Sequence, residues 1–209
     1  MNTRLQVEHS ITEEIIGIDL VKEQINIGNS RKLSVSSETL EILGHSIELR
    51  VYAEDPANDF LPDVGTLITH NVPKGPGVRV DDGFEQGMTL PNQYDPMISK
   101  LITHGKDREE ARRRMIRAID DYKISGIEIT LRFCKFTLQH SEFMSEHYNT
   151  DFVEKYFSSE QLKAHFNKEK EIIASIAVLT FLQDQSKNQE IKPKSDHYKS
   201  STWRNRLIK

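Results

Sequence analysis

The sequence predicts an α+β fold in which helices cover an antiparallel sheet. Several short segments between residues 45 and 103 have strand-like alternation, and turns rich in Pro and Gly separate them. Helical spacing of apolar residues occurs on both sides of this region, within 11–29 and 108–122. From about residue 151 onward the pattern favours helices alone, so we expect a C-terminal helical extension.

The chain opens with alternating side chains over residues 2–9. In an extended conformation four polar side chains would share one face: Asn2, Arg4, Gln6 and Glu8. The other face would carry Thr3, Leu5, Val7 and His9. A guanidinium, two carboxamides and a carboxylate together suit a small planar oxyanion. An amphipathic strand with a solvated polar face explains the same pattern. We expect His9 to be packed and hydrogen-bonded rather than a catalytic base.

Apolar spacing then predicts one helix from Ile11 to Asn29. Ser10 or Thr12 is the expected N-cap, because a hydroxyl can accept a hydrogen bond from a free backbone N–H group of the first turn. Gly28 is the expected C-terminal stop. A polar connection follows over residues 32–39.

Four strands are expected next, over 45–53, 67–72, 78–81 and 97–103. On the first of them Arg50 shares a face with Glu48 and Tyr52. Loop residues Pro56, Pro62 and Gly65 follow it. The segment Pro73–Gly77 is a strong turn signal between the second and third strands.

Asp107 is the expected N-cap of a helix over 108–122. Its apolar stripe consists of Ala111, Met115, Ala118, Ile119 and Tyr122. The same helix carries Arg112, Arg113, Arg114 and Arg117, which are flanked by acidic residues. We therefore interpret these arginines as an ion-paired surface rather than as a nucleic-acid patch.

The remaining elements are a strand over 127–130 that starts after Gly126, and a short helix over 131–139. Ser158 or Ser159 is the expected cap of a helix that runs to His165, and a second helix is expected through 172–182. From Gln185 onward polar residues dominate, which indicates a mobile tail or a segment that a partner orders.

Composition excludes several classes of function. The net charge of -4 gives no global field for nucleic acid or membrane, and we find no run of 18 apolar residues and no secretory signal. The single cysteine, Cys134, excludes an internal disulfide and suits a reducing compartment. The eight histidines show no spacing typical of zinc ligation.

Four ordered blocks carry a resemblance to a known family. They are NTRLQVEH at 2–9, GHSIELRVYAEDP at 44–56, FLP at 60–62 with Gly65, and YDPMISKL at 94–101. Together they resemble the biotin carboxylase domain of biotin-dependent carboxylases, an ATP-grasp family, over about residues 1–155. Ser10, Ile129 and Thr130 depart from the family pattern, which usually has Pro at the first position and Thr-Asn at the other two.

The resemblance implies roles for particular residues. Glu8 would be the general base that takes the bicarbonate proton, and Arg50 would stabilise the enolate oxygen of biotin. Bicarbonate would be held by Arg4, Gln6 and the backbone N–H of Val7. The implied substrates and cofactors are ATP, bicarbonate, carrier-bound biotin, and Mg²⁺ or Mn²⁺. Asn2 would lie at the metal, and Thr150 would lie near the adenine.

The resemblance also implies an organisation. Residues 1–43 would end an ATP-grasp lobe with a strand and a helix, 44–155 would form the biotin carboxylase C-terminal domain, and 156–209 would be an extension. Ile191-Lys192-Pro193 and Trp203 resemble the start of a coupling domain in acyl-CoA carboxylase alpha subunits. The expected partners are the N-terminal part of the biotin carboxylase, a biotin carboxyl carrier domain and a carboxyltransferase subunit, in the cytoplasm or the mitochondrial matrix.

The chain alone is expected to be inactive, because the phosphate-binding lysines, the glycine-rich loop and the metal-ligating glutamates of the family would lie before residue 1. A non-catalytic docking module is the alternative. Other ATP-grasp ligases, of the carbamoyl-phosphate or purine pathways, lack the Gln-Val-Glu-His continuation and the block at 44–56.

Overall fold

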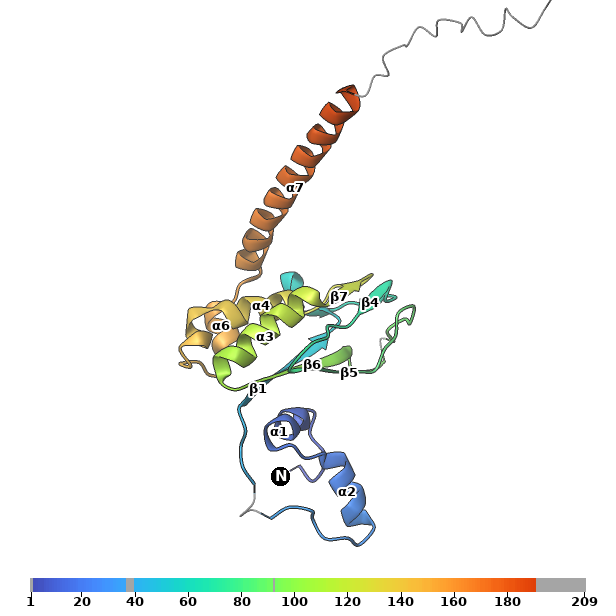
Figure 1. Ribbon diagram of the computed structural model, residues 1–209, viewed down its shortest axis with the longest axis vertical. Helices are drawn as coiled ribbons and strands as arrows, with labels where there is room; N and C mark the ends of the chain where they lie inside the picture. The colour runs from blue at the N-terminus through green and yellow to red at the C-terminus, as the bar shows by residue number, and fades with distance from the viewer. Residues whose placement is uncertain (1, 37–39, 92, 191–209) are drawn as a thin grey trace, which may run out of the picture. The chain divides into compact units, whose positions relative to one another are not determined.

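The computed structural model describes residues 2–36, 40–91 and 93–190. The chain divides into two compact units, Met1–Leu162 and Lys163–Lys209. Most of the elements predicted from the sequence belong to the first unit, and Figure 1 labels them along the chain.

The N-terminal segment differs from the prediction. Residues 2–8 form no strand, and helix α1 (His9–Ile16) begins directly after them. Its N-cap is Glu8, which makes no side-chain cap hydrogen bond, so the predicted caps Ser10 and Thr12 are wrong.

The single helix predicted over 11–29 is also wrong, since a second helix, α2 (Leu20–Gly28), follows α1. The break has a local cause: Gly17 adopts a left-handed φ of 68°, and Asp19 restarts the helix by accepting a hydrogen bond from the Lys22 N–H. The predicted end at Gly28 is confirmed.

A three-stranded antiparallel sheet forms the centre of the first unit, which confirms the predicted antiparallel sheet, but the strand predicted over 67–72 is not part of it. Its order is β1 (His45–Tyr52), β6 (Met97–Gly105) and β5 (Val78–Asp82). Two small ribbons accompany it: β2 (Glu54–Asp55) pairs with β3 (Leu61–Pro62), and β4 (Thr69–Asn71) pairs with β7 (Lys123–Ser125). A turn of 3₁₀ helix, Pro56–Asn58, lies in the loop after β2.

The strand predicted over 127–130 is wrong, because β7 ends before Gly126. Gly126 has a φ of 100°, and a Cβ atom there would lie 2.2 Å from the backbone oxygen of Thr66. The glycine therefore makes a tight turn under a neighbouring loop rather than the start of a strand.

Helices α3 and α4 follow the prediction closely. Helix α3 (Arg108–Asp121) is capped by Asp107, whose carboxylate accepts a hydrogen bond from the Glu110 N–H. All five residues of its predicted apolar stripe are buried. Helix α4 (Leu131–Gln139) is followed by α5 (Ser141–Met144) and α6 (Phe152–Tyr156).

Three of the four arginines predicted to be ion-paired on α3 form ion pairs, and the fourth, Arg117, donates to the Pro76 carbonyl at 3.5 Å. Arg112 and Arg113 contact Glu109 at 2.7 and 3.6 Å, and Arg114 contacts Glu110 at 2.8 Å. Their charge is therefore compensated on the helix itself.

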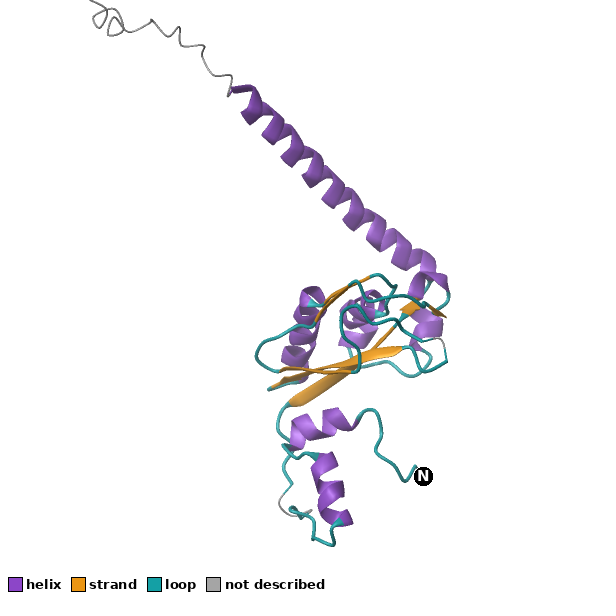
Figure 2. Ribbon diagram, turned by 90° about the vertical axis from the view of Figure 1, so that its right-hand side faces the viewer, coloured by secondary structure: helices purple, strands orange, loops and turns teal. Residues whose placement is uncertain are grey.

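The sheet has two chemically different faces. One face packs against α3 and carries apolar side chains of all three strands: Ile47, Leu49, Val51, Val78, Val80 and Leu101. The other face carries Glu48, Arg50, Arg79, Asp81 and Lys100, and its contacts reach α1 and the segment before it. Figures 1 and 2 show α1 on one side of the sheet and α3 on the other.

The second unit contains most of helix α7 (Ser159–Glu190). Two helices were predicted here, but one continuous helix forms. Ser158 caps its start by accepting a hydrogen bond from the Gln161 N–H. The polar segment predicted from Gln185 begins inside this helix. The resemblance noted for Ile191-Lys192-Pro193 and Trp203 lies outside the described residues.

Candidate functional site

The segment before α1 lines an open pocket of about 630 Å³. Its polar lining includes the four residues predicted to share a face: Asn2, Arg4, Gln6 and Glu8. Leu5 and His9 line the same pocket, so the predicted separation of the two faces is wrong. The four polar groups meet because a turn at Val7 and Glu8 curves the segment into α1, rather than because a strand aligns them.

Arg50 joins this group from the sheet. Its Nη2 lies 2.8 Å from Oε2 of Glu8, and the two side chains are 40% and 51% exposed. A hydrogen bond with the Tyr52 side chain, helped by the charges of Glu8 and Glu48, raises the pKa of Arg50 above its ordinary value. Exposed pairs of this kind add little stability. The pair leaves both groups accessible to a ligand.

His9 is hydrogen-bonded, as expected. Its Nδ1 lies 2.7 Å from the backbone oxygen of Gln6. This contact closes the turn that leads into α1, which is a structural use of the imidazole.

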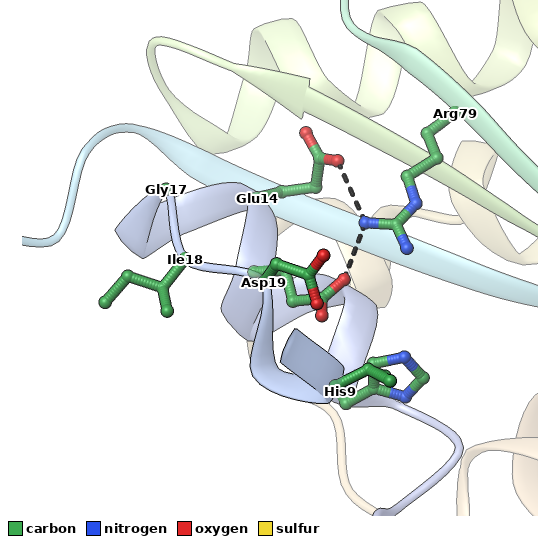
Figure 3. Close-up of a pocket in the computed structure, with 8 residues that line it drawn as sticks. His9, Glu14, Gly17, Ile18, Asp19 and Arg79 are labelled. Atoms are coloured by element: carbon green, nitrogen blue, oxygen red, sulfur yellow. Dashed lines mark hydrogen bonds and ion pairs between the residues drawn. The ribbon is translucent and has the colours of Figure 1, made fainter. Parts of the chain in front are cut away.

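Arg79 of β5 anchors α1 to the sheet. Its Nη1 contacts Glu13 at 2.8 Å and Glu14 at 3.4 Å, and its Nε contacts Asp81 at 2.8 Å. Figure 3 shows the guanidinium between the carboxylates of α1, beside a second pocket of about 590 Å³. The other oxygen of Glu13 accepts a hydrogen bond from the Leu20 N–H, so the same carboxylate also fixes the start of α2.

Lys100 of β6 lies deeper in the same face, and its side chain is only 10% exposed. Its Nζ donates to the Val7 carbonyl at 3.1 Å and to Ser10 Oγ at 2.6 Å, and it lies 3.2 Å from Asp81 Oδ2. Burial opposes ionisation of Asp81, but hydrogen bonds from Arg79 and Lys100 hold the pKa of its carboxyl below the ordinary value.

Glu48 is the half-buried carboxylate of this face. Burial raises its pKa, against the opposing charges of Lys100, Arg50 and His9. Among the described residues, its Oε2 is one of two buried side-chain polar atoms with no hydrogen-bond partner. Lys100 and Arg50 are therefore near enough to favour the charged form of Glu48, although none of the described residues donates a hydrogen bond to its Oε2.

Thr130 holds the backbone of β1 at and next to Arg50. Its Oγ1 accepts a hydrogen bond from the Tyr52 N–H at 3.1 Å and donates to the Arg50 carbonyl at 3.4 Å. The register of β1 against β6 shifts at this place, between Val51 and Tyr52. The hydroxyl thus satisfies backbone groups that the irregular ladder leaves without a strand partner.

Thr150 does not belong to this group. It is exposed in the turn before α6 and is not among the residues that line the pocket of Arg4 and Glu8. The structure therefore brings together Asn2, Arg4, Gln6, Glu8 and Arg50, while Val7 contributes a carbonyl that is already bound by Lys100.

Sequence reasoning missed Arg79, Asp81 and Lys100. A signal was present: Arg79 and Asp81 alternate with Val78 and Val80, and Lys100 interrupts the apolar run of β6. Charged residues at alternate positions of adjacent strands indicate a shared polar face.

The described residues do not make a complete metal site. Asn2 offers one oxygen ligand of the type that Mg²⁺ prefers. In the part of the chain that the structure describes, no group of three or more His, Cys, Asp or Glu side chains is placed to hold a metal ion. Within the same part, no helix is both long and apolar enough to cross a membrane.

Two family models match the chain. Residues 48–155 match the model described as biotin carboxylase C-terminal domain, and residues 1–36 match the model described as carbamoyl-phosphate synthase L chain, ATP binding domain. The first range contains all of the sheet except the first three residues of β1, together with helices α3 and α4, and the second contains the segment before α1 and both N-terminal helices.

Curated relatives agree with these models. Biotin carboxylase 1 of Bacillus subtilis is 46% identical over 156 residues, which are 75% of this chain and 35% of the relative. The human mitochondrial propionyl-CoA carboxylase alpha chain is 40% identical over 199 residues, which are 93% of this chain and 27% of the relative. The chain thus spans about a third or less of the length of these relatives.

Solved structures agree as well. The biotin carboxylase domain of a thermophilic 2-oxoglutarate carboxylase bound to bicarbonate has a TM-score of 0.73 and 38% identity, and the match covers 74% of this chain and 35% of that one. The Hydrogenobacter thermophilus domain in complex with MgADP, ADP and bicarbonate has the same TM-score and identity, and covers 74% of this chain and 34% of that one. The α+β fold predicted from the sequence is confirmed.

Proposed function

Since this chain belongs to the biotin carboxylase family, we propose that it forms the C-terminal part of a subunit that uses ATP and bicarbonate to carboxylate carrier-bound biotin. The observation that carries the proposal is the 2.8 Å contact between Arg50 and Glu8, beside the pocket that Arg4 and Gln6 line. Two segments 42 residues apart in the sequence meet there.

Bicarbonate is held first. The guanidinium of Arg4, the carboxamide of Gln6 and the backbone N–H of Val7 supply donors for its oxygens, a geometry that a lysine could not reproduce. Glu8 then takes the bicarbonate proton, and the resulting dianion attacks the γ-phosphate of ATP, whose bond to ADP breaks, to give carboxyphosphate and ADP. Asn2 would be an oxygen ligand of a divalent metal, whose charge would offset that of the phosphates.

Arg50 serves the second half of the reaction. When a ureido nitrogen of biotin loses its proton, negative charge develops on the ureido oxygen, and the guanidinium stabilises it. The exposure of Arg50 supports this role, because a buried arginine could not meet a substrate that arrives on a separate carrier. Thr150 stays a proposed adenine contact, with only its position in the sequence behind it.

The domain division 1–43, 44–155 and 156–209 stays part of the proposal. The ranges matched by the two family models, 1–36 and 48–155, support the first two parts. The match to the human propionyl-CoA carboxylase alpha chain over 93% of this chain supports an acyl-CoA carboxylase context for the third.

Helix α7 supports the proposed partners. Seven large apolar side chains between residues 172 and 182 are exposed: Ile172, Ile173, Ile176, Val178, Leu179, Phe181 and Leu182. At 100° per residue these positions fall on all sides of the helix, and a helix that is apolar all round is normally buried. Contact with a biotin carboxyl carrier domain or a carboxyltransferase subunit would cover it. The cytoplasm or the mitochondrial matrix stays the proposed compartment.

A chimera tests the proposed function. The matched region of Bacillus subtilis biotin carboxylase 1 is replaced by the corresponding residues of this chain, and bicarbonate-dependent ATP hydrolysis with free biotin is measured. We expect the chimera to be active. Glu8→Gln and Arg50→Gln should each lower kcat by about 10²-fold or more, while Arg113→Gln, at an exposed position of α3, should not.

The same experiment distinguishes the proposed catalytic role from the alternative, a non-catalytic docking module. A folded chimera that binds ATP but does not turn it over would favour docking. The isolated 209-residue chain should hydrolyse no ATP in either case, and biotin-dependent turnover by it alone would contradict the proposal.

A further inference from the structure

Lys100 is a largely buried charged group beside the proposed site, with a side chain only 10% exposed, and the mechanism above does not use it. Its three ammonium hydrogens have three partners: the Val7 carbonyl at 3.1 Å, Ser10 Oγ at 2.6 Å and the carboxylate of Asp81 at 3.2 Å. A lysine with all three donors engaged has a fixed position, although its side chain is otherwise flexible.

The partners of Lys100 lie on both sides of Glu8. Val7 directly precedes the proposed base, and Ser10 is buried in the first turn of α1. Residues 2–8 form no helix or strand, so no backbone ladder holds them in place. The bonds to Val7 and Ser10 therefore fix the conformation of the residues that carry the proposed base and the proposed bicarbonate donors.

Lys100 is also in register with Arg50. The two residues are direct partners on β1 and β6, and Asp81 of β5 is the direct partner of Lys100 on its other side. Directly opposite like charges repel one another. Here each cation has its own carboxylate, since Asp81 contacts Lys100 and Glu8 contacts Arg50. The charge of Glu48 acts on both cations as well. These negative charges offset the repulsion, so the two cations can be direct neighbours across the strands.

From this geometry we propose that Lys100 is a positioning residue for the carboxylation site: it holds the Val7–Ser10 turn on the sheet, so that Glu8 meets Arg50 and the bicarbonate donors stay aligned. The inference rests on the proposed function, but it adds a residue that touches neither substrate. A purely structural lysine would only stabilise the fold. A positioning lysine also sets the affinity for bicarbonate.

Hydrogen exchange of this chain tests the positioning directly. In Lys100→Met the two hydrogen-bonded amides of this turn, those of His9 and Ile11, should exchange about 10-fold faster, because a charge-assisted hydrogen bond to the turn is lost, while those of α3 stay protected. Lys135→Met is the matched control. Lys135 on α4 also forms one short ion pair, with Asp120 at 2.6 Å, but it does not contact this segment. Unchanged exchange of the His9 and Ile11 amides in Lys100→Met would overturn the proposal.

Kinetics in the chimera separate positioning from stability. Lys100→Met should raise the KM for bicarbonate about 10-fold to 100-fold and change the KM for ATP less than about twofold, since a displacement near 1 Å of a binding group can cost 10²-fold. Lys100→Arg, which keeps the charge and the donors, should recover part of the loss. A structural role would lower the amount of active enzyme and leave both KM values unchanged, which would overturn the proposal.

A Lys100→Met variant that fails to fold and a chimera that is inactive each require a separate measurement. If Lys100→Met does not accumulate as folded protein, Lys100→Gln keeps a polar group at this depth and is expected to show the same split between the two KM values. An inactive unsubstituted chimera would count against the proposed function, whereas an active chimera whose bicarbonate KM ignores Lys100 would count against this inference alone.

Discussion

Replacing Arg79 by Met should weaken the attachment of the N-terminal helices to the sheet without unfolding the sheet itself. The substitution keeps most of the length and apolar stem of the side chain and removes its charge and donors. It leaves Glu13, whose side chain is 9% exposed, without its 2.8 Å partner, and it removes a short contact to Asp81.

The size of the effect follows from burial. Hydrogen bonds to charged groups contribute about 1.5–3 kcal/mol, whereas exposed ion pairs contribute about 0–1 kcal/mol. Arg79 is 34% exposed and Glu13 is nearly buried, so solvent screens the pair only in part. We expect the free energy of unfolding to fall by about 2 kcal/mol, which for a unit of this size corresponds to a loss of about 4–8 °C in Tm.

Urea unfolding of Arg79→Met and of a control, Arg113→Met, measures the difference. Arg113 is 68% exposed and lies 3.6 Å from Glu109, so the control should lose less than about 0.5 kcal/mol. Hydrogen exchange should increase in α1 and at the start of α2, where Glu13 binds the Leu20 N–H. Equal losses in the two variants, or faster exchange spread evenly over the sheet, would refute the reasoning.

Four further predictions concern single residues. Burial raises the pKa of Glu48, so its contribution to folding stability is present at low pH, where it is protonated, and is lost as the pH rises. Glu48→Gln should therefore be more stable than the native chain near pH 7 and equally stable near about pH 3. Asp81 has a lowered pKa, so Asp81→Asn should show the reverse: a loss of stability near pH 7 that disappears as the pH falls. If the stability of either variant changed with pH in parallel with that of the native chain, the prediction for that variant would be wrong. Thr130→Val leaves the Tyr52 N–H without its acceptor and should cost about 1–2 kcal/mol in urea unfolding at an unchanged m-value. Gly126→Ala should cost about 3 kcal/mol through strain and overlap with Thr66, while Gly83→Ala, with nothing within 4 Å, should stay within about 0.5 kcal/mol.

The regular parts of the fold could be predicted because local chemistry determines them. The Asp107 cap and the apolar stripe of α3 lie within one helix, and the alternation in β1 and β6 lies within single strands. The failures have two different causes. Gly126 makes a turn because the distant Thr66 carbonyl approaches it, whereas Gly17 breaks the helix locally, through a left-handed backbone conformation that apolar spacing does not reveal.

The candidate site, too, could be predicted only in part. The sequence motif identified Arg4, Glu8 and Arg50, because each belongs to a local pattern. It could not show that Lys100 binds the Val7 carbonyl, a contact between residues 93 positions apart. Nor could it show that a turn, and not a strand, brings the polar groups of residues 2–8 to one pocket.

The chemical difference between the two faces of the sheet also restricts which insertions and deletions the chain can tolerate. Deleting one codon of β6 before Lys100 would move the following side chains to the opposite face, so that Lys100, which faces α1, would enter the layer beneath α3. Insertions and deletions that natural variants tolerate should therefore fall in the connection between β5 and β6. The length of β6 should vary less among functional homologues than the identity of its apolar residues.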